Sequence, residues 1–277
     1  AWRMLARSTG LMAMGGKIPF ACSFSQFVTG KALEQLRLAV CYQQLPVKIA
    51  GSHGGLSVGA DGATAEALEE LTHMRSLPFM TVLIPCDALE AKKATIASAS
   101  HPGPVFLRLG RNPVPTLTRP EDPFVIGQAR LLRDGTDVSL IACGTMVAHA
   151  LQAAELLANE GIQTRVINLH TIKPIDRAAI LQAARDTGAI VTAEEHTVIG
   201  GLGSAVAEVV VQEHPVPMKF VGVQDRFGTS GDPAELFKVF HLMPEDLVKA
   251  VKDVLQLKQQ TVGSPARLER APGRARL

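Results

Sequence analysis

The segment of residues 51–64 combines glycines with two side chains that can do acid–base chemistry. It reads Gly-Ser-His-Gly-Gly-Leu-Ser-Val-Gly-Ala-Asp-Gly-Ala-Thr, with the histidine at position 53 and the aspartate at 61. Glycines let the backbone approach a ligand closely, and a helix start presents unpaired N–H groups to an anion. An ordinary strand-to-helix crossover with Asp61 near an N-cap explains the glycines equally well. The presence of His53 together with Asp61 favours a binding or catalytic site.

Three aromatic residues lie close together near the N-terminus. The chain has only twelve (ten Phe, one Trp and one Tyr), and Phe20, Phe24 and Phe27 are among them. Phe24 and Phe27 are three residues apart, a spacing that puts both on one face of a helix. Core packing is the ordinary use of such a pair. A flat heteroaromatic ligand could also stack on these rings.

Charged residues mark two further strand ends. Arg108 and Arg111 close a predicted strand, where a guanidinium fork can bind phosphate or carboxylate. Position alone favours a solvated strand end or an ion pair between domains. Glu194, Glu195 and His196 close another strand and could serve as acid–base groups or metal ligands. Three adjacent residues cannot easily converge on one ion, and hydrogen bonds at an interface are an equally good interpretation.

Alternating short and long segments must position these side chains. Short β-branched runs, predicted as strands, cover residues 47–50, 81–84, 105–109, 138–142, 164–169, 190–193 and 219–223. Ala-, Leu- and Glu-rich runs, predicted as helices, cover residues 63–74, 88–99, 147–159, 177–187, 203–211, 233–240 and 244–257. This alternation indicates the α/β class, with mostly parallel sheets covered on both faces. His53 and Asp61 then follow the carboxyl end of a strand, where open sheets bind ligands.

Proline density suggests a division into two domains. Four prolines fall within residues 112–123, which indicates a linker. We expect a first domain over residues 1–118 and a second over residues 119–257. Residues 258–277 are polar and rich in Pro, Gly and Arg, a composition typical of disorder. The chain does not begin with Met, which suggests a processed, truncated or fragmentary N-terminus.

Charge and cysteine content narrow the class of protein. The chain has 28 Lys+Arg against 26 Asp+Glu, and its net charge of +2 is too small to indicate a nucleic-acid or membrane surface. No apolar run reaches the ~20 residues of a membrane span. Four scattered cysteines without a CxxC pair favour a reduced, cytoplasmic protein over a disulfide framework.

Several rare strings together resemble the C-terminal section of transketolases, which use thiamine diphosphate. In the family's order they are GKIPF at 16–20, SHGGLSVGADG at 52–62, MRSLP at 74–78, PCD at 85–87, IKPID at 172–176, EEH at 194–196, GGLGS at 200–204 and DRFG at 225–228. The resemblance implies a pyrimidine-binding domain, incomplete at its N-terminus, followed by a transketolase C-terminal domain.

The resemblance also implies roles for single residues. Phe24 and Phe27 match aromatics that stack on the cofactor's aminopyrimidine. His53 and Arg111 match residues that face the substrate phosphate, and Asp61 matches one that faces a hydroxyl near the reacting carbons. His53 and Asp61 are therefore the candidate catalytic residues, and no residue of this chain is expected to bind metal. The implied reaction transfers a two-carbon ketol unit between sugar phosphates, as in pentose phosphate metabolism.

In this family the diphosphate and its Mg²⁺ are held by a domain that precedes this section. We therefore expect an N-terminal transketolase section or subunit as the partner, in a dimer or another homo- or hetero-oligomer. Nucleic acid and membrane partners are not expected.

Two departures from the family pattern bear on activity. The family's catalytic glutamate aligns with Ala1, and its His-Gln pair aligns with Ala65 and Glu66. We expect truncation to explain Ala1, which leaves catalysis by this chain as it stands open. The alternatives are a non-catalytic assembly or regulatory subunit, a deoxyxylulose-phosphate synthase, or the beta subunit of a 2-oxoacid dehydrogenase.

Overall fold

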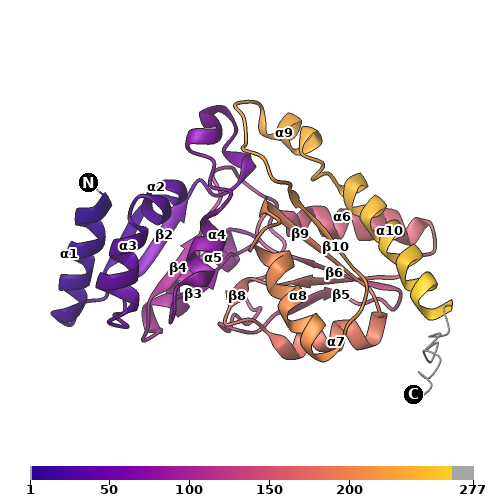
Figure 1. Ribbon diagram of the computed structural model, residues 1–277, viewed down its shortest axis with the longest axis horizontal. Helices are drawn as coiled ribbons and strands as arrows, with labels where there is room; N and C mark the ends of the chain where they lie inside the picture. Colours follow the sequence, from indigo (N-terminus) through magenta and orange to yellow (C-terminus); the bar gives the residue numbers. More distant parts are fainter. Residues whose placement is uncertain (1, 264–277) are drawn as a thin grey trace, which may run out of the picture.

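The computed structural model describes the backbone of residues 2–263 and the side chains of residues 7–260. Two five-stranded sheets lie beside one another, each flanked by helices (Figure 1). The prediction of two α/β domains with mostly parallel sheets is confirmed.

The first sheet has the strand order β1-β2-β4-β3-β8. Its strands are β1 (Phe20–Phe24), β2 (Lys48–Ser52), β3 (Thr81–Leu83), β4 (Val105–Arg108) and β8 (Thr171–Lys173). The first four are parallel, with Phe24 opposite Ser52 and Gly51 opposite Arg108. Their carboxyl ends therefore lie at one edge of the sheet, where the predicted site residues begin.

Strand β8 belongs to the second half of the chain but joins the first sheet. It pairs antiparallel with β3, with Thr171 opposite Leu83. The two halves are therefore connected by backbone hydrogen bonds as well as by side chains.

The second sheet has the order β10-β9-β6-β7-β5. Its strands are β5 (Arg130–Arg133), β6 (Val138–Ala142), β7 (Thr164–Asn168), β9 (Ile190–Thr197) and β10 (Met218–Val223). Only β5 runs antiparallel to its neighbour. All five residues of the central strand β6 are buried, as expected for a parallel sheet covered on both faces.

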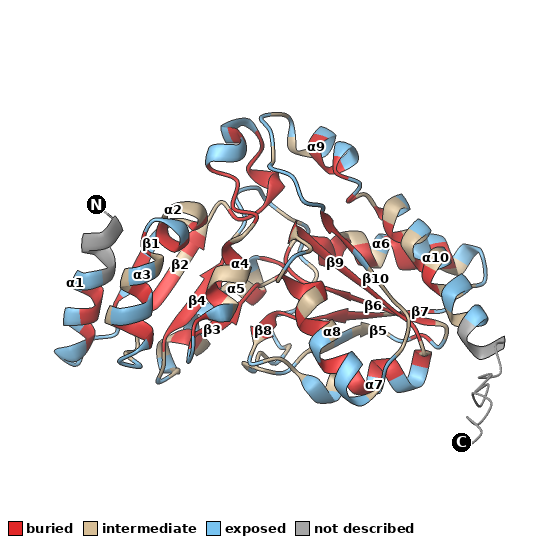
Figure 2. Ribbon diagram, in the orientation of Figure 1, coloured by how far each residue is buried: buried red, intermediate tan, exposed pale blue. Residues whose placement is uncertain are grey.

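Helices cover both sheets, and many of their buried residues lie on the side that faces a sheet (Figure 2). They are α1 (Trp2–Met14), α2 (Ser25–Gly30), α3 (Leu33–Leu36), η1 (Arg37–Cys41), η2 (Leu56–Thr64), α4 (Glu70–Ser76), α5 (Ala88–Ser100), α6 (Met146–Asn159), α7 (Arg177–Thr187), α8 (Leu202–Glu213), α9 (Pro233–Val239) and α10 (Pro244–Gly263). Aspartates cap several of them. Asp87 accepts from the Glu90 N–H, and Asp176 accepts from the Ala179 N–H.

The predicted helix over residues 63–74 is wrong in its first half. Residues 63–64 end η2, and α4 begins only at Glu70. Between them Ala67 forms a bridge with Gly54, and its carbonyl accepts from the Gly55 N–H. The backbone at Ala67 thus pairs with the glycine segment instead of continuing a helix.

The predicted disorder from residue 258 onward is wrong for its first six residues. Helix α10 continues to Gly263, and Lys258 donates to the carbonyls of Asp137 and Thr187. Residues 264–277 lie outside the described residues, as does Ala1. None of the helices within residues 2–263 combines the length and hydropathy needed to cross a membrane.

Candidate functional site

The glycine segment is shaped by contacts with the rest of the chain. It leaves β2 through His53, whose φ of 58° is in the left-handed region, and enters η2, which is kinked at Gly59 and Gly62. A Cβ on Gly62 would lie 2.3 Å from Ser230 Oγ, and one on Gly59 would lie 2.9 Å from Pro233. These two glycines therefore allow the segment before α9 to approach η2, as Figure 1 shows.

Phe24, Phe27 and His53 form an aromatic group at the carboxyl edge of the first sheet. The Phe24 ring stacks on His53 at 3.7 Å and on Phe27 at 5.6 Å between centroids. The prediction that both phenylalanines share a helical face is wrong, because Phe24 ends β1 with extended backbone and only Phe27 lies in α2. The turn between strand and helix, rather than helical spacing, brings the rings together.

The surroundings of His53 favour its neutral form. Burial lowers its pKa, the nearby Arg111 lowers it further, and Asp61 opposes both. Its Nδ1 lies 3.0 Å from Ser52 Oγ. At neutral pH the ring is therefore uncharged and can donate or accept one hydrogen bond to a ligand.

Arg111 and Asp61 meet beside the same segment. Arg111 Nη1 donates to the Val58 carbonyl at 2.6 Å and lies 3.6 Å from Asp61 Oδ2, and each side chain is 38% exposed. Both contacts use Nη1, so among the described residues the other two guanidinium nitrogens remain available to an anion. The structure thus brings His53, Asp61 and Arg111 into one accessible neighbourhood.

Arg108 does not reach this surface. Its side chain is 5% exposed, and its Nε donates to Glu70 Oε1 at 2.5 Å. Its Nη2 donates to the Glu195 carbonyl at 3.0 Å. Its Nη1 lies 3.9 Å from Glu195 Oε1, and this longer contact is the ion pair between domains. The shorter pair with Glu70 lies within the first domain, and Glu70 had no signal in the sequence.

Glu194 and His196 are also occupied by structural hydrogen bonds. Glu194 accepts from the N–H groups of Leu202 and Gly203, and so caps the start of α8. His196 accepts at Nε2 from the Leu71 N–H, and its Nδ1 lies 2.7 Å from the Thr197 carbonyl. Burial lowers the pKa of His196 to about 3, so the ring is neutral. Both of its nitrogens are engaged, which leaves none for a metal ion.

Glu66 is an unusual buried acid beneath the site. It is 2% exposed, and neither carboxyl oxygen has a hydrogen-bond partner among the described residues. A Cβ on Gly228 would lie 1.7 Å from its Oε2, so a side chain there would displace the carboxyl. Burial, and then the nearby Glu195, raise the pKa of Glu66 to about 7. The carboxyl is therefore shielded from solvent and has a proton affinity well above that of an ordinary glutamate.

Replacing Glu66 with glutamine is expected to stabilise the protein at alkaline pH. The native pKa of about 7 lies above the ordinary 4.5, so Glu66 makes unfolding easier as pH rises between these values. Above pH 7 the Glu66→Gln variant should gain on the order of 2 kcal/mol in the free energy of unfolding. Below pH 4.5 the gain should disappear. Urea unfolding of both proteins from pH 4 to 8.5 tests this, and a pH-independent difference would contradict it.

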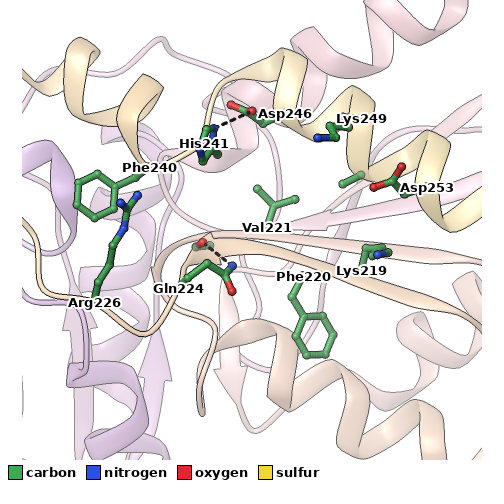
Figure 3. A pocket seen from close by; sticks show the side chains of 12 residues that line it. Lys219, Phe220, Val221, Gln224, Arg226, Phe240, His241, Asp246, Lys249 and Asp253 are labelled. Atoms are coloured by element: carbon green, nitrogen blue, oxygen red, sulfur yellow. Dashed lines mark hydrogen bonds and ion pairs between the residues drawn. The ribbon is translucent and has the colours of Figure 1, made fainter.

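A separate groove of about 540 Å³ lies between β10 and α10 (Figure 3). Lysines and aspartates both line it, including Lys219, Lys249, Asp246 and Asp253. None of the site residues predicted from the sequence lies there, and the mixture of charges favours no particular ligand.

Comparisons with known proteins cover both domains. Family profiles described as "Transketolase, pyrimidine binding domain" and "Transketolase, C-terminal domain" match residues 3–116 and 127–247. The 6-deoxy-6-sulfo-D-fructose transketolase subunit of Clostridium sp. (strain MSTE9) is 44% identical over 255 residues, covering 92% of this chain and 79% of its own length. An apulose-4-phosphate transketolase subunit of Phocaeicola vulgatus is 39% identical over 250 residues, covering 90% of this chain and 80% of its own length.

A solved structure is similar over nearly the whole chain. It is a split-gene transketolase described as an inactive beta4 tetramer, with a TM-score of 0.89 and 45% sequence identity. The match covers 93% of this chain and 83% of that one.

Proposed function

The chain belongs to the transketolase family, and from this we propose that it is the C-terminal section of a thiamine diphosphate-dependent transketolase that transfers a two-carbon ketol unit between sugar phosphates. The observation that carries the proposal is the grouping of Phe24, His53, Asp61 and Arg111 at one edge of the first sheet. These residues come from three separate stretches of the chain.

The aromatic pair suits the pyrimidine of the cofactor. Phe24 and Phe27 are both half-buried, and their rings lie within 16° of parallel. Such a surface stacks a flat heteroaromatic ring and excludes water from one of its faces. When bound, thiamine diphosphate supplies the nucleophilic carbon that adds to the ketose carbonyl.

The polar residues suit a sugar phosphate. Arg111 offers a fixed cation for the phosphate, oriented by its contacts with Val58 and Asp61. His53, neutral at physiological pH, can donate one hydrogen bond to the same group. The proposal assigns Asp61 to a sugar hydroxyl, from which its carboxylate accepts, and its charge lies 3.6 Å from Arg111 Nη1.

The diphosphate is assigned to a partner in this proposal. Within the described residues, no group of His, Cys, Asp and Glu is arranged to hold a metal ion. We propose that an N-terminal transketolase section supplies the Mg²⁺ and diphosphate site in a mixed oligomer. The split-gene relative, described as an inactive beta4 tetramer, supports the assignment of this site to a separate section.

Mixing experiments test the proposal. The chain is combined with a diphosphate-binding section from the same genome, with thiamine diphosphate and Mg²⁺, and the cleavage of a donor ketose phosphate is followed. Turnover is expected in the mixture and not from either section alone. A mixture that forms a stable complex without turnover would overturn the enzymatic assignment.

A non-catalytic subunit is the second candidate, and Ala65 is the observation that favours it. This residue is 5% exposed and offers no polar group where the family carries a histidine. If the chain serves only in assembly, a double variant with Ala1→Glu and Ala65→His in the same mixture should create turnover that the parent lacks. Measurable turnover in the parent mixture would remove this candidate.

A further inference from the structure

Glu195 reaches from the second domain into the glycine segment of the first. Its Oε2 accepts from the Ser57 N–H at 3.1 Å, and its Oε1 accepts from the hydroxyls of Ser57 and Thr145 at 3.1 Å each. The side chain is 2% exposed. Two of these three donors belong to Ser57 and attach the carboxylate to the glycine segment. Hydrogen bonds to a charged group that water cannot reach are stronger than ordinary ones.

The position of Glu195 on its strand explains why it, and not its neighbour, makes this contact. Successive side chains of a strand point to opposite faces, so Glu194 turns toward α8 while Glu195 turns toward the first domain. Gly55, with a φ of 90°, lies directly against it. A Cβ there would be 2.4 Å from Glu195 Cδ, so a side chain would displace the carboxylate.

The opposite side of the same backbone is held by residues that begin the linker. The Ser57 carbonyl accepts from Asn112 Nδ2 at 2.6 Å, and the Val58 carbonyl accepts from Arg111 Nη1 at 2.6 Å. Ser57 and Val58 are adjacent, so Glu195 and Arg111 bind the same short piece of backbone from opposite sides. Movement of this stretch would move the guanidinium and its neighbour Asp61.

We propose that Glu195 is a positioning residue for the substrate phosphate, which holds Ser57 so that Arg111 is presented in a fixed geometry. This inference rests on the proposed function, because it assigns the anion at Arg111 to a sugar phosphate. It gives the second domain an indirect part in substrate binding, through Ser57 and Arg111 and without contact with the substrate. It also predicts that Glu195 matters only for substrates that carry the phosphate.

The test compares Glu195→Gln with Glu194→Gln in the mixed complex. The two glutamates are equally buried neighbours, but Glu194 hydrogen-bonds to the start of α8 and serves as the control. For a phosphorylated donor ketose, Glu195→Gln should raise KM about 10-fold with kcat within about 3-fold of the parent, from the loss of a hydrogen bond to a charged group. For a non-phosphorylated ketose its KM should match that of Glu194→Gln.

Hydrogen exchange and a second variant, Ser57→Ala, provide independent checks of the same inference. Hydrogen exchange of a peptide spanning residues 54–62 should be faster in Glu195→Gln than in Glu194→Gln. Should Glu195→Gln fail to fold, Ser57→Ala removes one donor and should raise the same KM about 3-fold. A parent mixture that binds the ketose phosphate without turnover overturns the proposed function, and calorimetric titration then compares the variants. An active parent in which the two glutamine variants behave alike overturns this inference.

Discussion

Replacing Arg108 with methionine is expected to lower the free energy of unfolding by about 3–5 kcal/mol. Arg108 lies between two buried acids, Glu70 and Glu195, whose side chains are 0% and 2% exposed. Methionine fills similar volume but leaves both carboxylates without their cation. Breaking a buried pair costs far more than the pair contributes, because the remaining charges stay out of water. Urea unfolding at pH 7.5 measures the change.

The loss in free energy of unfolding caused by Arg108→Met should become smaller as the pH falls. Burial raises the pKa of Glu70, and Arg108 opposes that rise. Without the arginine the pKa should rise further, so acidification neutralises the orphaned carboxyl and reduces the difference from the parent. Arg177→Met is the control, since its pair with Glu213 is 48% and 40% exposed and should contribute less than about 1 kcal/mol. Equal losses in the two variants would contradict the argument.

Much of the fold follows from patterns that are local in the sequence. The strand over 138–142 and the helix over 177–187 were predicted to the residue, because each is a continuous run bounded by clear breaks. The short strand β8 was missed. It is three residues long and exists only because β3 offers an antiparallel partner from the other half.

The site was predictable to the extent that it resembles a known family. His53, Asp61 and Arg111 were named from motifs, and the structure brings them together, although their roles stay proposals. The contacts that Arg108 and Glu195 make around the glycine segment were not predicted. Ser57 and Glu70 are ordinary residues in the sequence, and their importance comes from a carboxylate or guanidinium that approaches from more than 30 residues away.

Replacing Arg111 with alanine is expected to raise KM for a phosphorylated ketose about 30- to 100-fold. A charged hydrogen-bond donor contributes about 2–3 kcal/mol, and each 1.4 kcal/mol is a factor of ten in affinity. The side chain is 38% exposed, so its removal should change stability little. Arg111→Lys keeps the charge but loses the planar fork, and an increase of about 10-fold is expected. Steady-state kinetics with phosphorylated and non-phosphorylated donors tests the assignment, since the second should be unaffected.

The Arg111→Ala background also decides how Glu195 acts. If the carboxylate works by holding the stretch on which Arg111 rests, then Glu195→Gln should have no further effect on KM once the arginine is gone. The effects on binding free energy would then be strongly non-additive, as expected for residues that share one structural path. If the two effects instead add in full, Glu195 influences the substrate by a route independent of Arg111. A double-mutant cycle in KM distinguishes these outcomes, because the path from one side chain to the other runs through the adjacent backbone of Ser57 and Val58.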